Sequence, residues 1–201
     1  MPSGVPLNPG RIDWTGENPG ILLKNEAGDW SAMALFFRIA WSPKGAGSAL
    51  LLYTDPMQPG GGNCFLTDNE SLGRWLIDEF VTHFKAFAGV PAFQGLAIKP
   101  LHTAEPSGDP LSERYVERII GDDVFVELVW EELAPPRALE LPASETATGR
   151  HEMFSVLVAA EKASILVDGR PLPGKPGRRV QAGLESSTAF LYFCETWIRR
   201  E

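Results

Sequence analysis

The stretch "ERYVERIIGDDVFVELVWE", residues 113–131, decides the fold class, because charged and apolar residues alternate on both sides of a short polar turn. Taking residues 122–123 as the turn places two arginines opposite two glutamates. These opposed pairs are Arg114 with Glu131 and Arg118 with Glu127. A turn one residue longer would oppose glutamate to glutamate, and like charges directly across a ladder destabilise it. The stretch therefore predicts an antiparallel β-hairpin in the first register.

The other face of this hairpin carries a carboxylate among apolar side chains. Tyr115 opposes Trp130, and Glu117 opposes Leu128. If this face points into the protein, desolvation raises the pKa of Glu117 unless a cation or a donor compensates, which is the usual way in which a carboxyl group is prepared for acid–base chemistry. A wet position near the rim of the strand is the alternative for Glu117.

The rest of the chain carries the alternation of a mainly β protein. Residues 31–41, "SAMALFFRIAW", place apolar side chains on one face at a period of two. Residues 48–54, "SALLLYT", return as a strand that is apolar on both faces. From residue 93 onward, apolar runs are separated by proline-rich turns. Counted over the whole chain, these segments give about eight to ten strands, which predicts an antiparallel β-barrel or β-sandwich.

One segment has a helical period instead. Apolar residues within 70–89, "ESLGRWLIDEFVTHFKAFAG", recur at spacings of three and four, and Gly89 provides a stop. Thr67 and Glu70 have the spacing of a capping box at its start. We therefore expect one long amphipathic helix over about residues 69–88, with its aromatic stripe packed on the sheet.

Length and composition fit one globular domain. The chain has 201 residues, of which 44% are hydrophobic. Residues 1–20 hold four prolines and four glycines. We therefore expect an extended N-terminal arm over 1–20, followed by a single β-rich domain over 21–201.

The net charge and the hydropathy of the chain limit the classes of partner that we expect. The formal net charge of −8 argues against a nucleic-acid partner, because phosphate binding draws on Lys and Arg. No segment has the length and apolarity of a transmembrane helix, and the N-terminus has neither region of a signal peptide. We therefore expect a cytoplasmic protein without a membrane partner.

Cofactor and metal motifs are absent from the sequence. Cys64 and Cys194 lie far apart and no histidines have ligand spacing, so neither a zinc site nor a disulfide is expected, and both cysteines are expected to be buried. The glycines at 60–62 precede no Lys-Ser/Thr pair and therefore do not predict a phosphate-binding loop. A cationic segment near the C-terminus is interpreted as a solvated turn rather than an anion contact. Its cations are Arg170, Lys175, Arg178 and Arg179.

A short sequence pattern at the two ends of the β region resembles that of the lipocalins. The tripeptide "GDW" at 28–30 precedes the strand of residues 31–41, and two arginines at 199–200 end the last predicted strand. In lipocalins, a GxW tryptophan packs under an arginine from a late strand, so the resemblance implies a calycin-like barrel. The helix predicted at residues 70–88 departs from the lipocalin order, in which the main helix follows eight barrel strands, and no family is assigned.

Isolated charges inside apolar strands mark the candidate site. Arg38 interrupts "LFFRIAW", and Glu195 lies between Phe193 and Trp197 on one face of the last strand. If those strands are neighbours, Arg38 and Glu195 form a buried pair, either as a structural salt bridge or as a ligand anchor. The candidate ligand-binding residues are Arg38, Trp41, Tyr115 and Trp130, and the candidate catalytic residues are Glu117 and Glu195.

Such residues would form a concave apolar pocket with a few polar groups, which is the usual form of a small-molecule site. We therefore expect a binding protein for a small, largely apolar molecule with a polar or carboxylate group, which Arg38 anchors. One alternative is a cofactor-independent enzyme in which Glu117 or Glu195 is a general acid or base. Another is a structural or interaction domain with a filled interior. Whether the protein is an enzyme, and whether it forms a homodimer, stays open.

Overall fold

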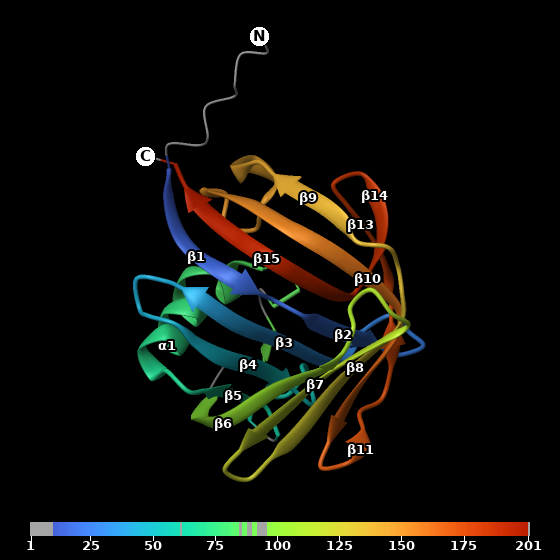
Figure 1. The fold of residues 1–201 in the computed structure, drawn as a ribbon. Helices are drawn as coiled ribbons and strands as arrows, with labels where there is room; N and C mark the ends of the chain where they lie inside the picture. Colours follow the sequence, from blue (N-terminus) through green and yellow to red (C-terminus); the bar gives the residue numbers. More distant parts are fainter. Residues whose placement is uncertain (1–9, 61, 85, 88–89, 92–95, 201) are drawn as a thin grey trace.

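The computed structural model describes residues 10–60, 62–84, 86–87, 90–91 and 96–200, and it is mainly β (Figure 1). The strands of the main sheet are β1 (Arg11–Glu17), β2 (Gly20–Lys24), β3 (Trp30–Trp41), β4 (Gly47–Tyr53), β5 (Cys64–Thr67), β6 (Ala97–Gly108), β7 (Arg114–Gly121), β8 (Phe125–Leu133), β9 (Arg137–Leu141), β10 (His151–Val167), β11 (Arg170–Pro171), β12 (Lys175–Pro176) and β15 (Ala189–Arg199). A separate hairpin consists of β13 (Arg178–Gln181) and β14 (Leu184–Ser187).

Nine strands close into a barrel (Figure 1). Their order is β10-β8-β7-β6-β5-β4-β3-β1-β15, and the pairing of β10 with β15 closes the ring. Strand β2 continues the sheet beside β1, between β3 and β15. The barrel is mixed rather than purely antiparallel, because β5 pairs with β6 in parallel. Helix α1 (Glu70–Glu79) lies in the connection between these two strands, and parallel pairing requires such a crossover.

Strands β7 and β8 form the hairpin that the sequence predicts. Both predicted Arg–Glu pairs are opposed, and Nε of Arg118 lies 3.0 Å from Oε1 of Glu127. The Gly121 N–H donates to the Val124 carbonyl across the turn. The exposed ion pairs fix the register, so the opposite face, which includes Glu117, is buried.

Two hydrophobic cores lie on opposite faces of β3 and β4. Along β3, Phe36 belongs to one core and the next residue, Phe37, to the other. The first, the lumen core, joins β3 and β4 to β7 and β8 across the barrel, and it includes Tyr115, Trp130 and the buried Cys64. The second, the outer core, lies between the other face of these strands and α1, and it extends to β9, β10 and β15. Burial on both faces explains why β4 is apolar throughout.

The helix is shorter than the sequence predicts. Helix α1 ends at Glu79, and a 3-10 turn (η1) follows over Val81–His83. The β-branched Val81 and Thr82 have low helix propensity, and Phe80 turns into the outer core against Trp14. The later part of the expected helix includes residues that lie outside the described ranges.

The start of the helix also differs from the prediction. The Asn69 side chain is the N-cap and accepts the Leu72 N–H at 3.2 Å. The Thr67 hydroxyl donates instead to the carbonyl of Ser48, on β4. Glu70 binds Arg74 one turn along the helix. The predicted capping box is therefore replaced by an asparagine cap.

Part of the expected N-terminal arm is built into the barrel. Strand β1 lies between β3 and β15, and Trp14 on β1 is fully buried in the outer core. Residues 1–9 lie outside the part of the chain that the structure describes. Within the described part, no helix is both long and apolar enough to cross a membrane.

Candidate functional site

The lumen holds an ion pair between Arg38 and Glu117. Nη2 of Arg38 lies 3.0 Å from Oε1 and 2.8 Å from Oε2 of Glu117, and the Tyr115 hydroxyl donates to Oε1 at 3.0 Å. Nη1 of Arg38 donates to Glu17, which β1 carries to a position beside β3. Three of the predicted site residues therefore meet, together with Glu17, which the sequence analysis left in the arm.

Burial dominates the electrostatics of this ion pair. Desolvation raises the pKa of Glu117, which is 0% exposed, and Arg38 and Tyr115 oppose part of that rise. Burial alone would lower the pKa of Arg38, but the hydrogen bond and the charge of Glu117 outweigh it and raise that pKa. Desolvation and the neighbouring Glu117 raise the pKa of Tyr115. Both oxygens of Glu117 have partners, as expected of a structural ion pair in a filled lumen.

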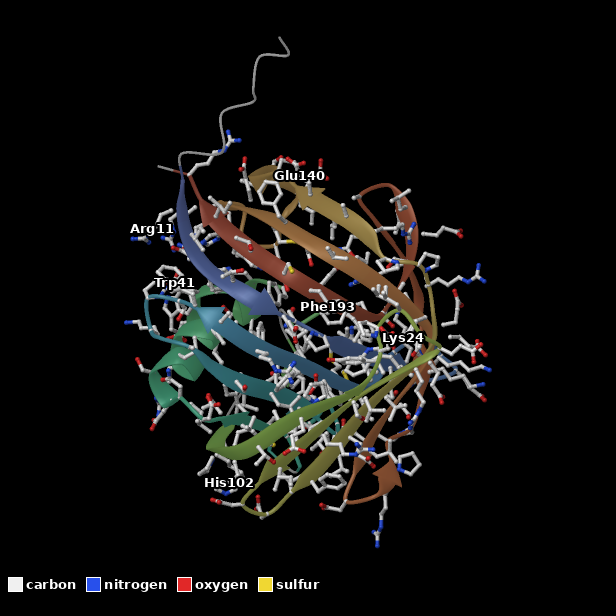
Figure 2. The ribbon with its side chains drawn as sticks, viewed as in Figure 1. Arg11, Lys24, Trp41, His102, Glu140 and Phe193 are labelled. Atoms are coloured by element: carbon white, nitrogen blue, oxygen red, sulfur yellow. The ribbon has the colours of Figure 1, made fainter. Side chains whose placement is uncertain are left out.

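The two tryptophans of the predicted set lie in different environments. Trp130 is fully buried in the lumen core, where its Nε1–H donates to the Gly20 carbonyl at 3.1 Å. Trp41 ends β3 and is 49% exposed. Figure 2 shows it far from Lys24, which lies beside the start of β3. Trp41 is therefore a surface residue, whereas Trp130 is enclosed.

A β-bulge decides the direction of Glu195. The register of β15 against β10 slips between Phe193 and Thr196, which leaves an extra residue on β15. Cys194 adopts a φ of 52° there, and it is exposed rather than buried as predicted. The extra residue resets the alternation, so Glu195 turns to the outer core and does not follow Phe193. The predicted pair of Arg38 with Glu195 is wrong for this reason.

Glu195 is a buried carboxyl with incomplete hydrogen bonding. It is 2% exposed, and its Oε1 accepts the Nε1–H of Trp197 at 2.8 Å. Its Oε2 has no hydrogen-bond partner among the residues that the structure places. Burial raises the pKa of Glu195 to about 8, and the Trp197 hydrogen bond opposes only part of that rise. The carboxyl is therefore mostly protonated at neutral pH.

Glu195 lies in the wall of a cavity of about 890 Å³ on the outer face of the barrel. Apolar wall residues come from the outer core and include Leu35, Phe190 and Trp197. Polar lining residues come from β13, which contributes Arg178 and Gln181, and from the 3-10 turn η3 (Ala143–Glu145), whose Ser144 is exposed. The lining of the cavity therefore combines apolar and polar side chains.

Arg179 on β13 is the cation nearest to the apolar wall. Its guanidinium lies 4.3 Å from the centre of the Phe190 ring, and its Nη2 donates to the Tyr192 hydroxyl at 3.0 Å. That hydroxyl donates in turn to Oε1 of Gln181 at 2.6 Å. Nε of Arg179 is buried and has no partner within the described ranges. The lining of the cavity thus includes two residues that each have one buried polar atom without a hydrogen-bond partner among the described residues, Oε2 of Glu195 and Nε of Arg179.

A second buried polar cluster ties β1 to β10 and β15. Nε2 of His151 lies 2.7 Å from Oδ2 of Asp13, Nδ1 lies 2.8 Å from the Thr148 hydroxyl, and Nε of Arg199 donates to Asp13 at 2.8 Å. Burial lowers the pKa of His151, although Asp13 opposes it. Desolvation would raise the pKa of Asp13, but His151 and Arg199 outweigh it and lower that pKa. Across the described residues, no cluster of His, Cys, Asp and Glu could hold a metal ion.

Comparison with protein-family models, curated proteins and solved structures finds no match to this chain. The functional conclusion therefore depends on the geometry of the candidate site, above all on the cavity that Glu195 and Arg179 line. In the lipocalin pattern, an arginine from a late strand packs on the tryptophan. Here the cation over the Trp30 ring is Lys24, at 4.7 Å, and Arg199 binds Asp13 instead.

Sequence reasoning singled out Glu195 but missed its surroundings. Arg179 was included in a segment interpreted as solvated, yet it is half-buried over Phe190. The only local signal was the Arg-Arg pair at 178–179 in a strand-like run. Nothing in that run indicates which strand of the barrel the hairpin covers.

Proposed function

We propose that the protein binds a small, largely apolar molecule that bears one polar group, in the cavity beside Glu195. The volume of about 890 Å³ lies within the range of small-molecule sites, and such sites combine apolar walls with a few polar groups. The proposal thus keeps the function expected from the sequence and moves its site from the lumen to the outer face.

The unpartnered oxygen of Glu195 is the observation that carries this proposal. A buried polar atom without a hydrogen bond costs free energy of folding, typically about 1–3 kcal/mol. Glu117 avoids that cost through Arg38 and Tyr115, whereas Glu195 has, among the residues that the structure describes, Trp197 alone. A ligand with a polar group would satisfy the second oxygen of Glu195 if the side chain turned this buried atom toward the cavity.

Native mass spectrometry of the freshly purified protein, compared with its denatured mass, tests the proposal. We expect a releasable adduct of small-molecule mass, or binding after incubation with a library of fatty acids, terpenoids and aromatic acids. A clean apo mass in both experiments would reject the proposal and favour a structural or interaction domain.

A pair of variants on one hairpin locates the binding site. Gln181 lines the cavity, so Gln181→Trp should obstruct it and abolish the adduct. Val180, the preceding residue, is 72% exposed, so Val180→Trp should leave the adduct intact. Equal effects of the two substitutions would place the ligand elsewhere.

A cofactor-independent enzyme is the second candidate function. A pKa of about 8 keeps Glu195 protonated at neutral pH, as a general acid requires. Glu117 is less suited to this role because both of its oxygens have partners. An enzyme predicts that Glu195→Gln retains ligand binding and abolishes conversion of the ligand, whereas a binding protein releases the ligand unchanged.

A further inference from the structure

We infer that the polar group of the ligand is a carboxylate, held by Arg179 and by the carboxyl group of Glu195. This inference rests on the proposed function, since it specifies the ligand of the same cavity. It requires that both residues line the cavity, that they have unused hydrogen-bonding capacity, and that the charges of the lining favour an anion.

The hairpin β13–β14 holds Arg179 in a position to bind an anion. Stacking on Phe190 and the hydrogen bond to Tyr192 fix the guanidinium plane, and they leave Nε–H without a partner among the described residues. A guanidinium fixed in this way loses little conformational freedom on binding a carboxylate. Arg179 therefore supplies the charge, whereas its unpartnered Nε–H is enclosed by protein atoms.

The charges that line the cavity favour an anion. Lys24, Arg178 and Arg179 line it, against Glu145 and the buried Glu195. With Glu195 protonated, the lining has two more positive than negative charges, whereas the whole chain has a formal net charge of −8. This local reversal attracts anions to the cavity and not to the rest of the surface.

The protonation state of Glu195 makes it a donor. Trp197 occupies Oε1, so the proton is carried by Oε2, which is enclosed by protein atoms and can donate to a ligand carboxylate once the side chain turns toward the cavity. The titratable and charged groups that line the same cavity, or that pack on the neighbouring Trp197, come from five elements. They are Tyr192 on β15, Arg178 and Arg179 on β13, Lys24 on β2, Glu145 in η3 and His151 on β10. Ionisation of Glu195 would turn this donor into a charge that repels the ligand.

A protonated amine with an apolar chain is the competing ligand. It would require ionised Glu195, and it would enter past Lys24, Arg178 and Arg179. The pKa of about 8 and these three cations both oppose it. The two ligand classes therefore predict opposite pH dependence, because raising the pH removes a donor from the carboxylate and creates a counter-ion for the ammonium.

Isothermal titration calorimetry with decanoate, decanol and decylamine tests the inference, because the three probes share a chain and differ in their polar group. For the wild-type protein at pH 7, we expect decanoate to bind at least about tenfold more tightly than either other probe. Arg179→Gln should weaken decanoate binding about tenfold and change decanol binding less than about twofold. Arg74→Gln, which removes an exposed cation on α1, is the control and should change neither.

A pH series isolates the contribution of Glu195. We expect the affinity of the wild-type protein for decanoate to fall about tenfold between about pH 7 and pH 9.5. Glu195→Gln keeps a neutral donor, so it should bind decanoate at pH 7 and show little pH dependence. A parallel fall in both proteins would overturn the role of Glu195.

The remaining outcomes separate the inference from the proposed function. Tightest binding of decylamine, or equal binding of decanol and decanoate, would overturn the carboxylate and leave the small-molecule site intact. Absence of binding by all three probes, together with a clean apo mass, would remove the proposed function itself.

Discussion

Glu117 and Glu195 take different roles because their neighbours differ. Burial raises the pKa of both carboxyls. Arg38 and Tyr115 provide partners for both oxygens of Glu117, whereas Oε2 of Glu195 has none in the described part of the chain. Glu117 therefore has its hydrogen bonds satisfied within the lumen, and the proposed function assigns the ligand contact to Glu195.

We expect Glu117→Ala to lower the free energy of unfolding by about 2 kcal/mol, because the buried Tyr115 hydroxyl loses its acceptor and the partly exposed Arg38 keeps only Glu17. Urea denaturation measures this loss. Glu127→Ala, which breaks a partly exposed pair with Arg118 on the other face of the same hairpin, is the control and should cost about 1 kcal/mol or less. Equal losses in the two variants would contradict the structural role of Glu117.

The contact of His151 with Asp13 predicts sensitivity to acid. The pKa of His151 is lowered in the folded protein, so the unfolded chain binds the proton more readily once the pH falls below the ordinary value of 6.5. The pKa of Asp13 is lowered too, and its contribution is lost as the pH falls from 3.8 through that lowered value. Stability should therefore fall in two stages on acidification.

We expect the free energy of unfolding of the wild-type protein to fall as the pH drops below about 6.5 toward the lowered pKa of folded His151, the window of the His151 stage. His151→Gln should flatten this dependence, and urea denaturation across the window measures it. His102→Gln, at an exposed histidine, is the control. If the free energy of unfolding of His151→Gln depended on pH as steeply as that of the wild-type protein, another group would cause the effect.

At the scale of elements, Asn69 joins helix α1 to the turn between β3 and β4. Its Oδ1 caps the helix, and its Nδ2 donates to the carbonyls of Lys44 and Ala46 at 3.0 and 3.1 Å. One side chain therefore satisfies backbone groups of two elements. The sequence pattern favoured Thr67 because a capping box is a local signal, whereas the contacts of Asn69 span 23 to 25 residues.

We expect Asn69→Ala to lower the free energy of unfolding by about 1–2 kcal/mol, the usual cost of losing an N-cap together with the turn contacts. Glu70→Gln, which changes an exposed first-turn residue, is the matched control and should cost about 0.5 kcal/mol or less. Chemical denaturation monitored by circular dichroism compares the variants. An unchanged free energy of unfolding in Asn69→Ala would show that the cap does not stabilise the protein.

At the scale of the whole molecule, the two cores share β3 and β4. Trp130 reports on the lumen core, and Trp14 and Trp197 report on the outer core. The lumen core cannot lose β3 without exposing the outer core, because successive residues of that strand serve different cores. The barrel should therefore unfold as one unit.

We expect a single urea transition for this reason. Trp130→Phe removes the tryptophan of the lumen core, and the double substitution Trp14→Phe with Trp197→Phe removes the two buried tryptophans of the outer core. Each variant should show the same midpoint by fluorescence and by far-ultraviolet circular dichroism. The two variants need not have equal stability, since each probe is compared within its own protein. Separate midpoints for the two signals would show that one core unfolds before the other.

The sequence by itself determined the mainly β class and the register of the β7–β8 hairpin, because period-two alternation and cross-strand charge pairs are local properties. It also marked Glu117 and Glu195 as unusual, since a charge among apolar strand residues is visible in one dimension. It did not determine the length of α1, where tertiary packing of Phe80 adds to weak propensity.

Only the tertiary structure decided which buried charges meet and where the cavity lies. The bulge at Cys194 moved Glu195 to the outer face, and β1 brought Glu17 to Arg38 from a segment expected to be an arm. The parallel pairing of β5 with β6 and the placing of Arg179 over Phe190 are also contacts between distant segments. Local patterns fix which face of a strand is apolar, but barrel closure fixes which strands and charges become neighbours.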